Sequence, residues 1–239
     1  MSRSFDRSVT NLRPLTATRN YLKDPLGSCL IEFGDTKVLC AVTITDGVGV
    51  WRAGKGLGWV TAEYAMLPAA TTTRTRRETK GRTGRSQEIQ RLIGRSLRTV
   101  VDMSGLGECT VTVDCDVIQA DGGTRTAAIT GAWIALYDAL EAWKRAGKIA
   151  ANPIVDQVAA ISVGLVDGEV LLDLDYSEDS IAEVDMNIVQ NSKGEFIEIQ
   201  GTGEQVAFSR ERMNEMLDVA TAGIAKLLEF QRTTLGIEA

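Results

Sequence analysis

The chain contains no histidine. This absence excludes Ser-His-Asp and Cys-His nucleophilic catalysis, and it argues against the common zinc sites, most of which use histidine. Proton transfer near neutral pH must therefore use carboxylates, lysine, tyrosine or a metal-bound water.

Cysteine is also scarce, and none of the four residues forms a C-x-x-C pair: Cys29, Cys40, Cys109 and Cys115. Cys109 and Cys115 are six positions apart in the sequence ECTVTVDCDV, so on a strand they would share one face. We expect all four to be buried free thiols in a reducing compartment.

Long apolar runs are missing as well. The first residues, MSRSFDRSVTNLRP, lack the apolar stretch of a signal peptide, and no segment approaches the ~18 apolar residues of a membrane helix. With 239 residues, of which 44% are hydrophobic and 24% charged, the composition is ordinary for a globular protein. We expect a cytoplasmic protein without membrane contact, built as one large domain or two lobes that share a core.

The order of strands and helices predicts the fold class. Five segments have the composition of strands or strand pairs: 27–44, 57–67, 108–119, 158–179 and 185–204. Apolar residues at helical spacing predict three helices: one from Ser86, one after the turn at Gly122-Gly123, and one from an N-cap at Ser209 to about Phe230. This order predicts an α+β fold with mixed sheets packed with helices, divided near 144–154 into lobes 1–150 and 151–239.

Positive charge is concentrated in one segment of an acidic protein. Between Arg74 and Arg98 there are nine Lys and Arg residues and two Glu, a local charge of +7, although the whole chain carries −6. Residues 71–85 hold no large apolar side chain, which predicts a mobile loop. This segregation indicates a polyanionic partner, and a merely solvated loop is an equally supported alternative.

The sequence QADGGTRTAAITGAW suits phosphate binding. Gly122 and Gly123 let the backbone approach a ligand, Thr124 offers a hydroxyl, and Arg125 offers a bidentate donor. The helix that follows would add its N-terminal amides. The stretch matches no nucleotide-binding fingerprint, and a strand–Gly-Gly–helix turn alone is more often structural.

The sequence DLDYSEDSIAEVDMN concentrates six carboxylates: Asp173, Asp175, Glu178, Asp179, Glu183 and Asp185. Their mutual repulsion is costly unless a cation compensates for it, and oxygen ligands without His or Cys suit Mg²⁺ or Mn²⁺. The alternative is an ordinary acidic loop, with Asp173 and Asp175 on one solvated face of a strand. Together with the two phosphate-friendly elements, this stretch suggests a metal-assisted phosphoryl or nucleotidyl reaction.

In these same segments the chain resembles the RNase PH family of phosphate-dependent 3′→5′ exoribonucleases, which is related to polynucleotide phosphorylase and the exosome ring. The matching pieces occur in the family's order between about residues 12 and 208: LRPLTATRNY, EFGDTKVLCAVTI, GWVTAEYAMLP, EIQRLIGRSLR, DCDVIQADGGTRTAAITGA, EDSIAEVDMN and EIQGTGE. The resemblance implies two β-α lobes of the ribosomal-S5-like type, and a homohexameric ring built as a trimer of dimers.

The resemblance also implies roles for individual residues. Inorganic phosphate, as co-substrate, would bind four of them: Arg85, Gly123, Thr124 and Arg125. Two catalytic carboxylates, Asp179 and Asp185, would bind Mg²⁺, with Mn²⁺ as the alternative. The arginines before the helix would contact RNA: Arg74, Arg76, Arg77 and Arg82.

The reaction implied is reversible phosphorolysis, which shortens an RNA 3′ end by one nucleotide and releases a nucleoside diphosphate. Phosphate is the nucleophile, so the missing histidine is no obstacle. The implied substrates are tRNA precursors and other RNA 3′ ends. A non-catalytic RNA-binding ring subunit is the runner-up, and the filled phosphate and metal positions argue against it. A small-molecule kinase would require an ATP-phosphate loop, which the sequence lacks.

Three further arginines form a separate stripe on the helix that follows the basic loop: Arg91, Arg95 and Arg98. Stripes at this spacing are usually packing or surface features. We expect these residues to pair with acidic residues of the other lobe or of a neighbouring subunit, in preference to RNA.

Overall fold

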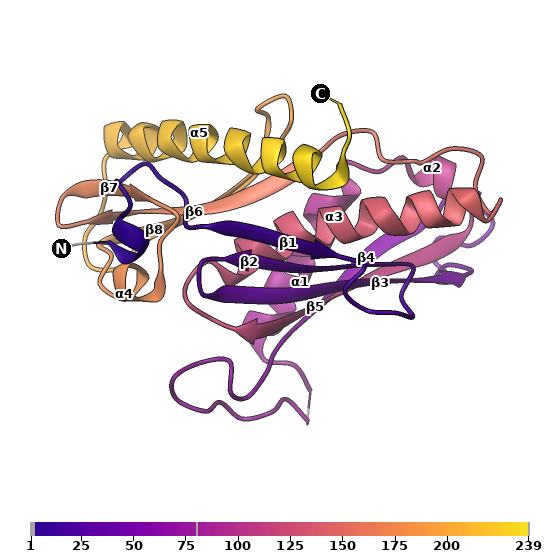
Figure 1. Cartoon of the computed structure of the whole chain (residues 1–239), viewed down its shortest axis with the longest axis horizontal. Helices are drawn as coiled ribbons and strands as arrows, with labels where there is room; N and C mark the ends of the chain where they lie inside the picture. The colour runs from indigo at the N-terminus through magenta and orange to yellow at the C-terminus, as the bar shows by residue number, and fades with distance from the viewer. Residues whose placement is uncertain (1–2, 80, 239) are drawn as a thin grey trace.

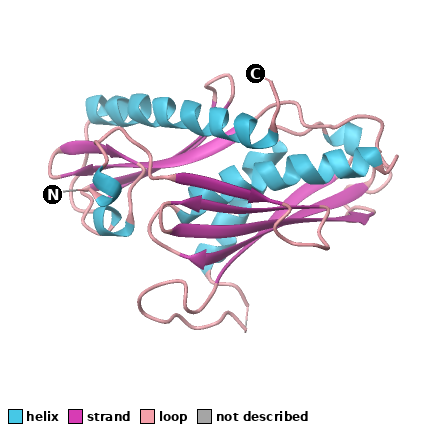
Figure 2. Cartoon of the chain, viewed as in Figure 1, coloured by secondary structure: helices cyan, strands magenta, loops and turns pink. Residues whose placement is uncertain are grey.

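Two β-sheets and the helices packed on them form an α+β fold, which confirms the predicted class (Figure 1, Figure 2). The structure is a computed structural model and describes residues 3–79 and 81–238. Lys80 of the basic segment, and Met1, Ser2 and Ala239 at the ends of the predicted lobes, lie outside the described residues. Over the two described ranges, no helix combines the length and the apolar composition needed to span a membrane.

The first sheet is mixed and has the strand order β1-β2-β3-β5-β4. Its strands are β1 (Leu15–Arg19), β2 (Gly27–Phe33), β3 (Thr36–Asp46), β4 (Trp59–Met66) and β5 (Cys109–Gln119). The predicted hairpin at Gly34-Asp35 joins β2 to β3, whereas β1 lies in a stretch for which the sequence predicts no strand. β4 and β5 are parallel, and the long helical connection between them provides the crossover that parallel strands require.

Helices cover one face of this sheet. Burial alternates along β3 and β5, so one face of each strand is buried. α1 (Gly84–Arg98) packs on β4, and α3 (Thr124–Arg145) packs on β2 and β3, while the short α2 (Met103–Leu106) precedes β5. All four cysteines are buried free thiols, as predicted, and burial raises the pKa of Cys29 to about 12.

The second sheet is antiparallel and has the strand order β7-β6-β8-β9. Its strands are β6 (Val158–Val166), β7 (Glu169–Leu172), β8 (Val184–Asn191) and β9 (Phe196–Gly203). Both predicted turns, at Asp167-Gly168 and Lys193-Gly194, join neighbouring strands here. α5 (Arg210–Leu235) lies across this sheet; it begins at the predicted cap, Ser209, and continues past the predicted end at Phe230 (Figure 1).

The helix α3 connects the two halves of the molecule. It packs against β2 and β3 of the first sheet and against β6 of the second. Most of its residues are buried and most of the buried ones are apolar, as expected for a helix inside a core. Every residue of β6 is buried, because α3 and α5 both pack against that strand. One continuous core therefore spans both sheets.

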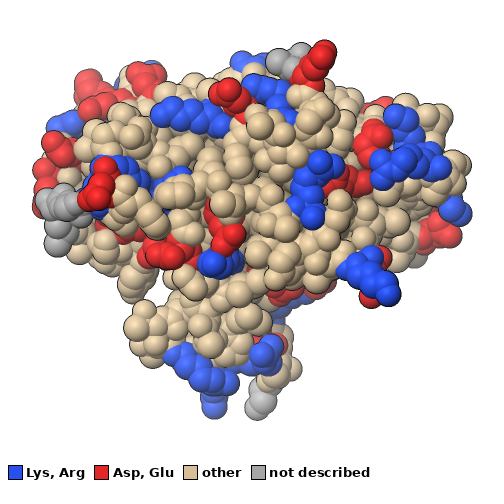
Figure 3. Space-filling view, viewed as in Figure 1, with Lys and Arg blue, Asp and Glu red and all other residues tan. Residues whose placement is uncertain are grey.

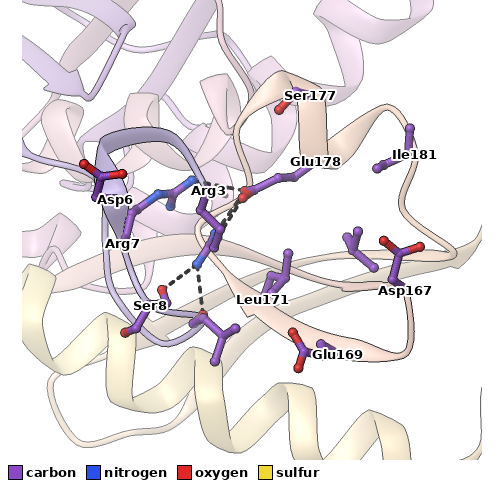
Figure 4. Close-up of a pocket in the computed structure, with 12 residues that line it drawn as sticks. Arg3, Asp6, Arg7, Ser8, Asp167, Glu169, Leu171, Ser177, Glu178 and Ile181 are labelled. Atoms are coloured by element: carbon purple, nitrogen blue, oxygen red, sulfur yellow. Dashed lines mark hydrogen bonds and ion pairs between the residues drawn. The ribbon is translucent and has the colours of Figure 1, made fainter. Parts of the chain in front are cut away.

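Two arginines of the N-terminal segment tie it to α4 (Tyr176–Asp179). Figure 4 shows the side chains of Arg3 and Arg7 converging on Glu178, at N–O distances of 2.6 and 3.1 Å. Arg7 also lies 3.3 Å from Asp175, the residue that caps α4. Two carboxylates of the acidic stretch are thus neutralised by arginines from the start of the chain.

The predicted strand over Asp173 and Asp175 is wrong. β7 ends at Leu172, Asp173 has a φ of 57°, and Asp175 is the N-cap of α4. Asp173 is fully buried and accepts two hydrogen bonds from the guanidinium of Arg13, at 3.2 and 2.7 Å, and one from the Arg13 amide at 2.7 Å. Where the chain leaves the strand, the buried carboxylate of Asp173 therefore lies against Arg13, and the ion pair compensates its charge.

We expect Asp173→Ala to lower the free energy of unfolding by about 3–5 kcal/mol, because Arg13 would keep a buried charge without its main partner. Urea denaturation measures this change. The matched control is Glu215→Ala, whose partner Arg212 is exposed, and its cost should be about 0.5 kcal/mol or less. Equal losses in the two variants would contradict a structural role for the buried pair.

Candidate active site

A cleft of about 450 Å³ lies between the two halves, and both halves line it. The first half contributes the start of α1 and the turn between β5 and α3; the second contributes residues of β6, α4 and β8. Every residue predicted to bind phosphate or metal lines this cleft: Arg85, Gly123, Thr124, Arg125, Asp179 and Asp185.

A second cavity of about 460 Å³ lies beside the N-terminal segment (Figure 4). Its two arginines, Arg3 and Arg7, already pair with Glu178, so their charge is compensated within the protein. The residues predicted to bind phosphate and metal line the other cavity, the cleft between the halves.

The turn at Gly122-Gly123 is rigid and requires both glycines. Each has a left-handed backbone, with φ of 74° and 63°. A Cβ on Gly122 would lie 2.5 Å from the carbonyl oxygen of Leu174, so no side chain fits there. The Thr36 hydroxyl donates to the Gly122 carbonyl at 2.6 Å. Gly123 caps α3 without a side-chain hydrogen bond, which leaves the first amides of this 22-residue helix open to an anion.

Neighbouring elements hold the side chains of Thr124 and Arg125, which follow the turn. The hydroxyls of Tyr64 and Thr124 lie 2.9 Å apart, and burial raises the pKa of Tyr64, which keeps it a neutral hydrogen-bonding group. Arg125 donates to the side-chain oxygen of Gln200 on β9 and lies 3.4 Å from Glu88 on α1. Arg125 is therefore oriented by contacts from both halves of the molecule.

Arg85 lies in the first turn of α1, which begins at Gly84 rather than at the predicted Ser86. Thr83 is the N-cap, and its hydroxyl accepts from the Ser86 amide at 3.3 Å. Glu78 accepts hydrogen bonds from the hydroxyls of Thr83 and Ser86, at 2.7 and 2.8 Å. These bonds fix the start of the helix, so the end of the basic segment is anchored where Arg85 enters the cleft.

Asp179 and Asp185 approach the cleft from α4 and β8. Burial, followed by the negative charge of Asp179, raises the pKa of Asp185 to about 6. Desolvation in the cleft also raises the pKa of Asp179, although Arg85 and Arg125 oppose this shift. Each carboxylate is thus destabilised by its surroundings, and a bound cation would relieve the repulsion between them.

The acidic stretch does not form the six-carboxylate cluster that its density suggests. Three of its members pair with N-terminal arginines: Asp173, Asp175 and Glu178. Within residues 3–79 and 81–238, no group of three or more His, Cys, Asp or Glu is placed to hold a metal ion. Asp179 and Asp185 nevertheless fit Mg²⁺, which binds proteins through one or two carboxylates and takes its other ligands from water and phosphate.

Residues that the sequence motifs do not single out also line the cleft, among them Ser162, Tyr176 and Asn187. The Asn187 side-chain amide donates to Asp185 at 3.3 Å. A signal for Asn187 is present in the sequence, because residues two apart on a strand share a face. Ser162 carries no such signal, since only the pairing of distant strands brings it to the cleft.

The basic loop between β4 and α1 projects from the body of the molecule, and Figure 3 shows Lys and Arg side chains at its end. Three of the predicted RNA-binding arginines are exposed on it: Arg74, Arg76 and Arg77. The fourth, Arg82, is half-buried and contacts Glu63 and Gln90. Arg82 therefore anchors the base of the loop, whereas the other three face solvent.

Two of the arginines on the separate α1 stripe have protein partners. Arg95 lies 2.6 Å from Glu198 on β9, which confirms the expected pairing with the other lobe. Arg98 donates to the Val60 carbonyl at 2.9 Å and lies over the Trp59 ring, 4.4 Å from its centre. Arg98 thus contacts a carbonyl and an aromatic ring in place of the acidic residue expected for it.

Comparison with known proteins identifies close relatives. The family model described as 3′ exoribonuclease family, domain 1, matches residues 11–140, and the model of domain 2 matches residues 156–223. Ribonuclease PH from Bacillus cereus strain AH187 is 56% identical over 233 residues, which cover 96% of this chain and 95% of the relative. The protein from strain G9842 gives the same values.

Solved structures share the fold at lower identity. The crystal structure of rice (Oryza sativa) Rrp46 superposes with a TM-score of 0.79 at 24% identity, covering 98% of this chain and 100% of that chain. A chain of the Archaeoglobus fulgidus exosome, solved with RNA bound to the active site, gives a TM-score of 0.83 at 22% identity, covering 95% and 92%. At these identities the likeness concerns the arrangement of strands and helices.

Proposed function

The chain belongs to the RNase PH family of 3′ exoribonucleases, and on this basis we propose how its cleft performs phosphorolysis. The protein is an enzyme that removes nucleotides from RNA 3′ ends with inorganic phosphate and releases nucleoside diphosphates. One observation carries the proposed mechanism: two arginines and two carboxylates, brought from both halves of the chain, line one cleft.

Phosphate binds between Arg85, Arg125 and the N-terminal amides of α3. Guanidinium groups match phosphate geometry, and a helix N-terminus favours an anion. The rigid turn and the hydrogen bond that Arg125 donates to Gln200 hold these donors in place before phosphate arrives. Holding phosphate against the last phosphodiester of the RNA makes the attack effectively intramolecular. This lowers the activation barrier by roughly 7–11 kcal/mol at best.

Bond changes in this reaction balance without a protein nucleophile. An oxygen of hydrogen phosphate attacks the terminal phosphorus, and the bond from phosphorus to the 3′ oxygen of the preceding ribose breaks. The 3′ oxygen takes up the proton that the hydrogen phosphate loses. Asp179 and Asp185 would hold Mg²⁺, or Mn²⁺, through their carboxylate oxygens. The bound cation supplies charge stabilisation for the transition-state oxygens. The reverse reaction adds nucleotides from nucleoside diphosphates.

We also propose a substrate, an assembly and a location for the enzyme. The substrates are tRNA precursors with 3′ extensions, along with other RNA 3′ ends; the assembly is a homohexameric ring, a trimer of dimers; and the location is the cytoplasm. The name of the Bacillus cereus relatives, Ribonuclease PH, supports RNA as the class of substrate. In a ring, the exposed arginines of the basic loop would be repeated around the RNA path, which accounts for their concentration in an acidic chain.

A phosphate-dependence assay tests the function. A tRNA precursor with a 3′ extension is incubated with enzyme and Mg²⁺, with and without inorganic phosphate. Shortening is expected only when phosphate is present. Shortening at the same rate in its absence would contradict phosphorolysis and indicate hydrolysis.

The basic loop should control the salt dependence of RNA binding. We expect the triple variant with alanine in place of Arg74, Arg76 and Arg77 to reduce the slope of log affinity against log salt by about 2, since each contact with single-stranded phosphate contributes roughly 0.7. Fluorescence anisotropy with labelled RNA over a KCl series measures this slope. The control replaces three exposed cations at the C-terminus of α3 and just after it with alanine: Lys144, Arg145 and Lys148. An equal effect of both triples would contradict the assignment.

A further inference from the structure

Tyr176 is an exposed aromatic residue at the edge of the active-site cleft. Its residue surface is 62% exposed, although it lines the cleft that holds the predicted phosphate and metal residues. It also lines an adjoining cavity of about 280 Å³, together with Thr71, Thr72, Thr73 and Ala120. Tyr176 therefore stands between the active site and the start of the basic loop.

The backbone of Tyr176 is held firmly, in contrast to its exposed ring. Its amide donates to the Asp121 carboxylate at 3.2 Å, which links α4 to the segment before the Gly-Gly turn. Asp175 and Glu178 form a capping box at the start of α4, and both carboxylates are fixed by Arg7. The ring is thus presented on a rigid support.

The position of Tyr176 relative to Asp179 indicates what it would contact. The two residues are three apart on one helical turn, so their side chains lie on the same side of α4. Both line the cleft. An RNA strand that places its terminal phosphodiester beside Asp179 and Arg85 would therefore carry its bases past the Tyr176 ring.

We propose that Tyr176 stacks on a nucleobase within the last few nucleotides of the RNA 3′ end. This assignment rests on the proposed function and adds a base-binding residue to its phosphate-binding and metal-binding groups. An aromatic ring accepts any base, because every base has a π-face. That property suits an enzyme that removes different nucleotides in succession, for which recognition of base edges by hydrogen bonds would be a disadvantage.

Substitution of Tyr176 tests the proposal through the RNA KM. Tyr176→Ala should raise the KM for a short single-stranded RNA about tenfold, whereas Tyr176→Phe and Tyr176→Trp should stay near wild type. The KM for phosphate and the melting temperature should not change, since the ring is exposed. Tyr21→Ala is the matched control, because Tyr21 is 50% exposed and lines none of the cavities described above. An unchanged RNA KM for Tyr176→Ala would overturn the proposal.

RNAs with one abasic nucleotide identify the stacked base. Wild-type enzyme should lose about tenfold in kcat/KM when one particular position near the 3′ end is abasic, and Tyr176→Ala should lose nothing further at that position. Equal losses in both enzymes at every position would overturn the inference. It would also be overturned if the only effect of the substitution were a change in assembly mass that does not depend on RNA. If wild-type activity were independent of phosphate, the proposed function would fail; a phosphate-dependent enzyme that is insensitive at Tyr176 would contradict this inference alone.

Discussion

Arg85→Ala should remove most of the enzyme's dependence on phosphate, with kcat/KM for phosphate falling by about 10²–10³. The reason is the loss of a charge-assisted, two-pronged donor at the point where we propose that the attacking phosphate binds. Arg85→Lys keeps the charge but loses the planar fork, so an intermediate loss is expected. Initial rates over a range of phosphate concentrations, at saturating RNA, measure the effect.

The control for this prediction lies on the same helix. Arg91 is exposed on α1 and does not line the cleft, so Arg91→Ala should leave the phosphate KM within about twofold of wild type. RNA binding by Arg85→Ala should also be largely retained, since the exposed loop arginines are untouched. If Arg85→Ala kept a normal phosphate KM, the phosphate site would lie elsewhere.

Asp185→Asn should reduce kcat by about 10²–10³, because the remaining carboxylate would hold the cation poorly and transition-state charge would be less stabilised. The amide preserves the shape of the side chain and can still accept the hydrogen bond from Asn187. Single-turnover rates with saturating RNA and phosphate measure the loss. Activity close to wild type would contradict a role for Asp185 at the reacting centre.

The same substitution should make the protein more stable at high pH. Burial and the charge of Asp179 raise the pKa of Asp185 from 3.8 to about 6, so the folded state favours the protonated carboxyl. This contribution to stability is fully present below pH 3.8 and is lost as the pH rises through about 6. Asparagine is neutral throughout, so the free energy of unfolding of Asp185→Asn should exceed that of wild type by up to about 3 kcal/mol at pH 8 and match it below pH 4. Denaturant unfolding at pH 4, 6 and 8 without Mg²⁺ checks this, and a pH-independent difference would contradict it.

Local sequence patterns predict much of the fold because turns and caps are short-range features. The hairpin at Gly34-Asp35 and the cap at Ser209 depend on residues adjacent in sequence, and both are present. β1 escapes prediction because its pairing with β2, and not its own composition, defines it. The arrangement of Asp173 escapes for a similar reason, since its partner Arg13 is 160 positions away.

The candidate site also combines features that the sequence predicts with contacts between distant residues that it does not. The resemblance places Arg85, Arg125 and Asp179 individually, and the structure brings them to one cleft; their roles there remain predictions. The density of carboxylates around Asp179 is misleading, because tertiary contacts with N-terminal arginines neutralise half of the cluster. Solvent exposure cannot be predicted from the sequence here, so Tyr176 becomes a candidate for base stacking only once the cleft is known.

The fate of the attacking phosphate tests the central claim most directly. Enzyme, RNA and Mg²⁺ are incubated with ³²P-labelled inorganic phosphate, and the released nucleotides are separated by chromatography. Phosphorolysis in this cleft predicts that the label appears in nucleoside diphosphates, at the β-phosphate, in a one-to-one ratio with nucleotides removed. Release of unlabelled nucleoside monophosphates at the same rate would contradict it.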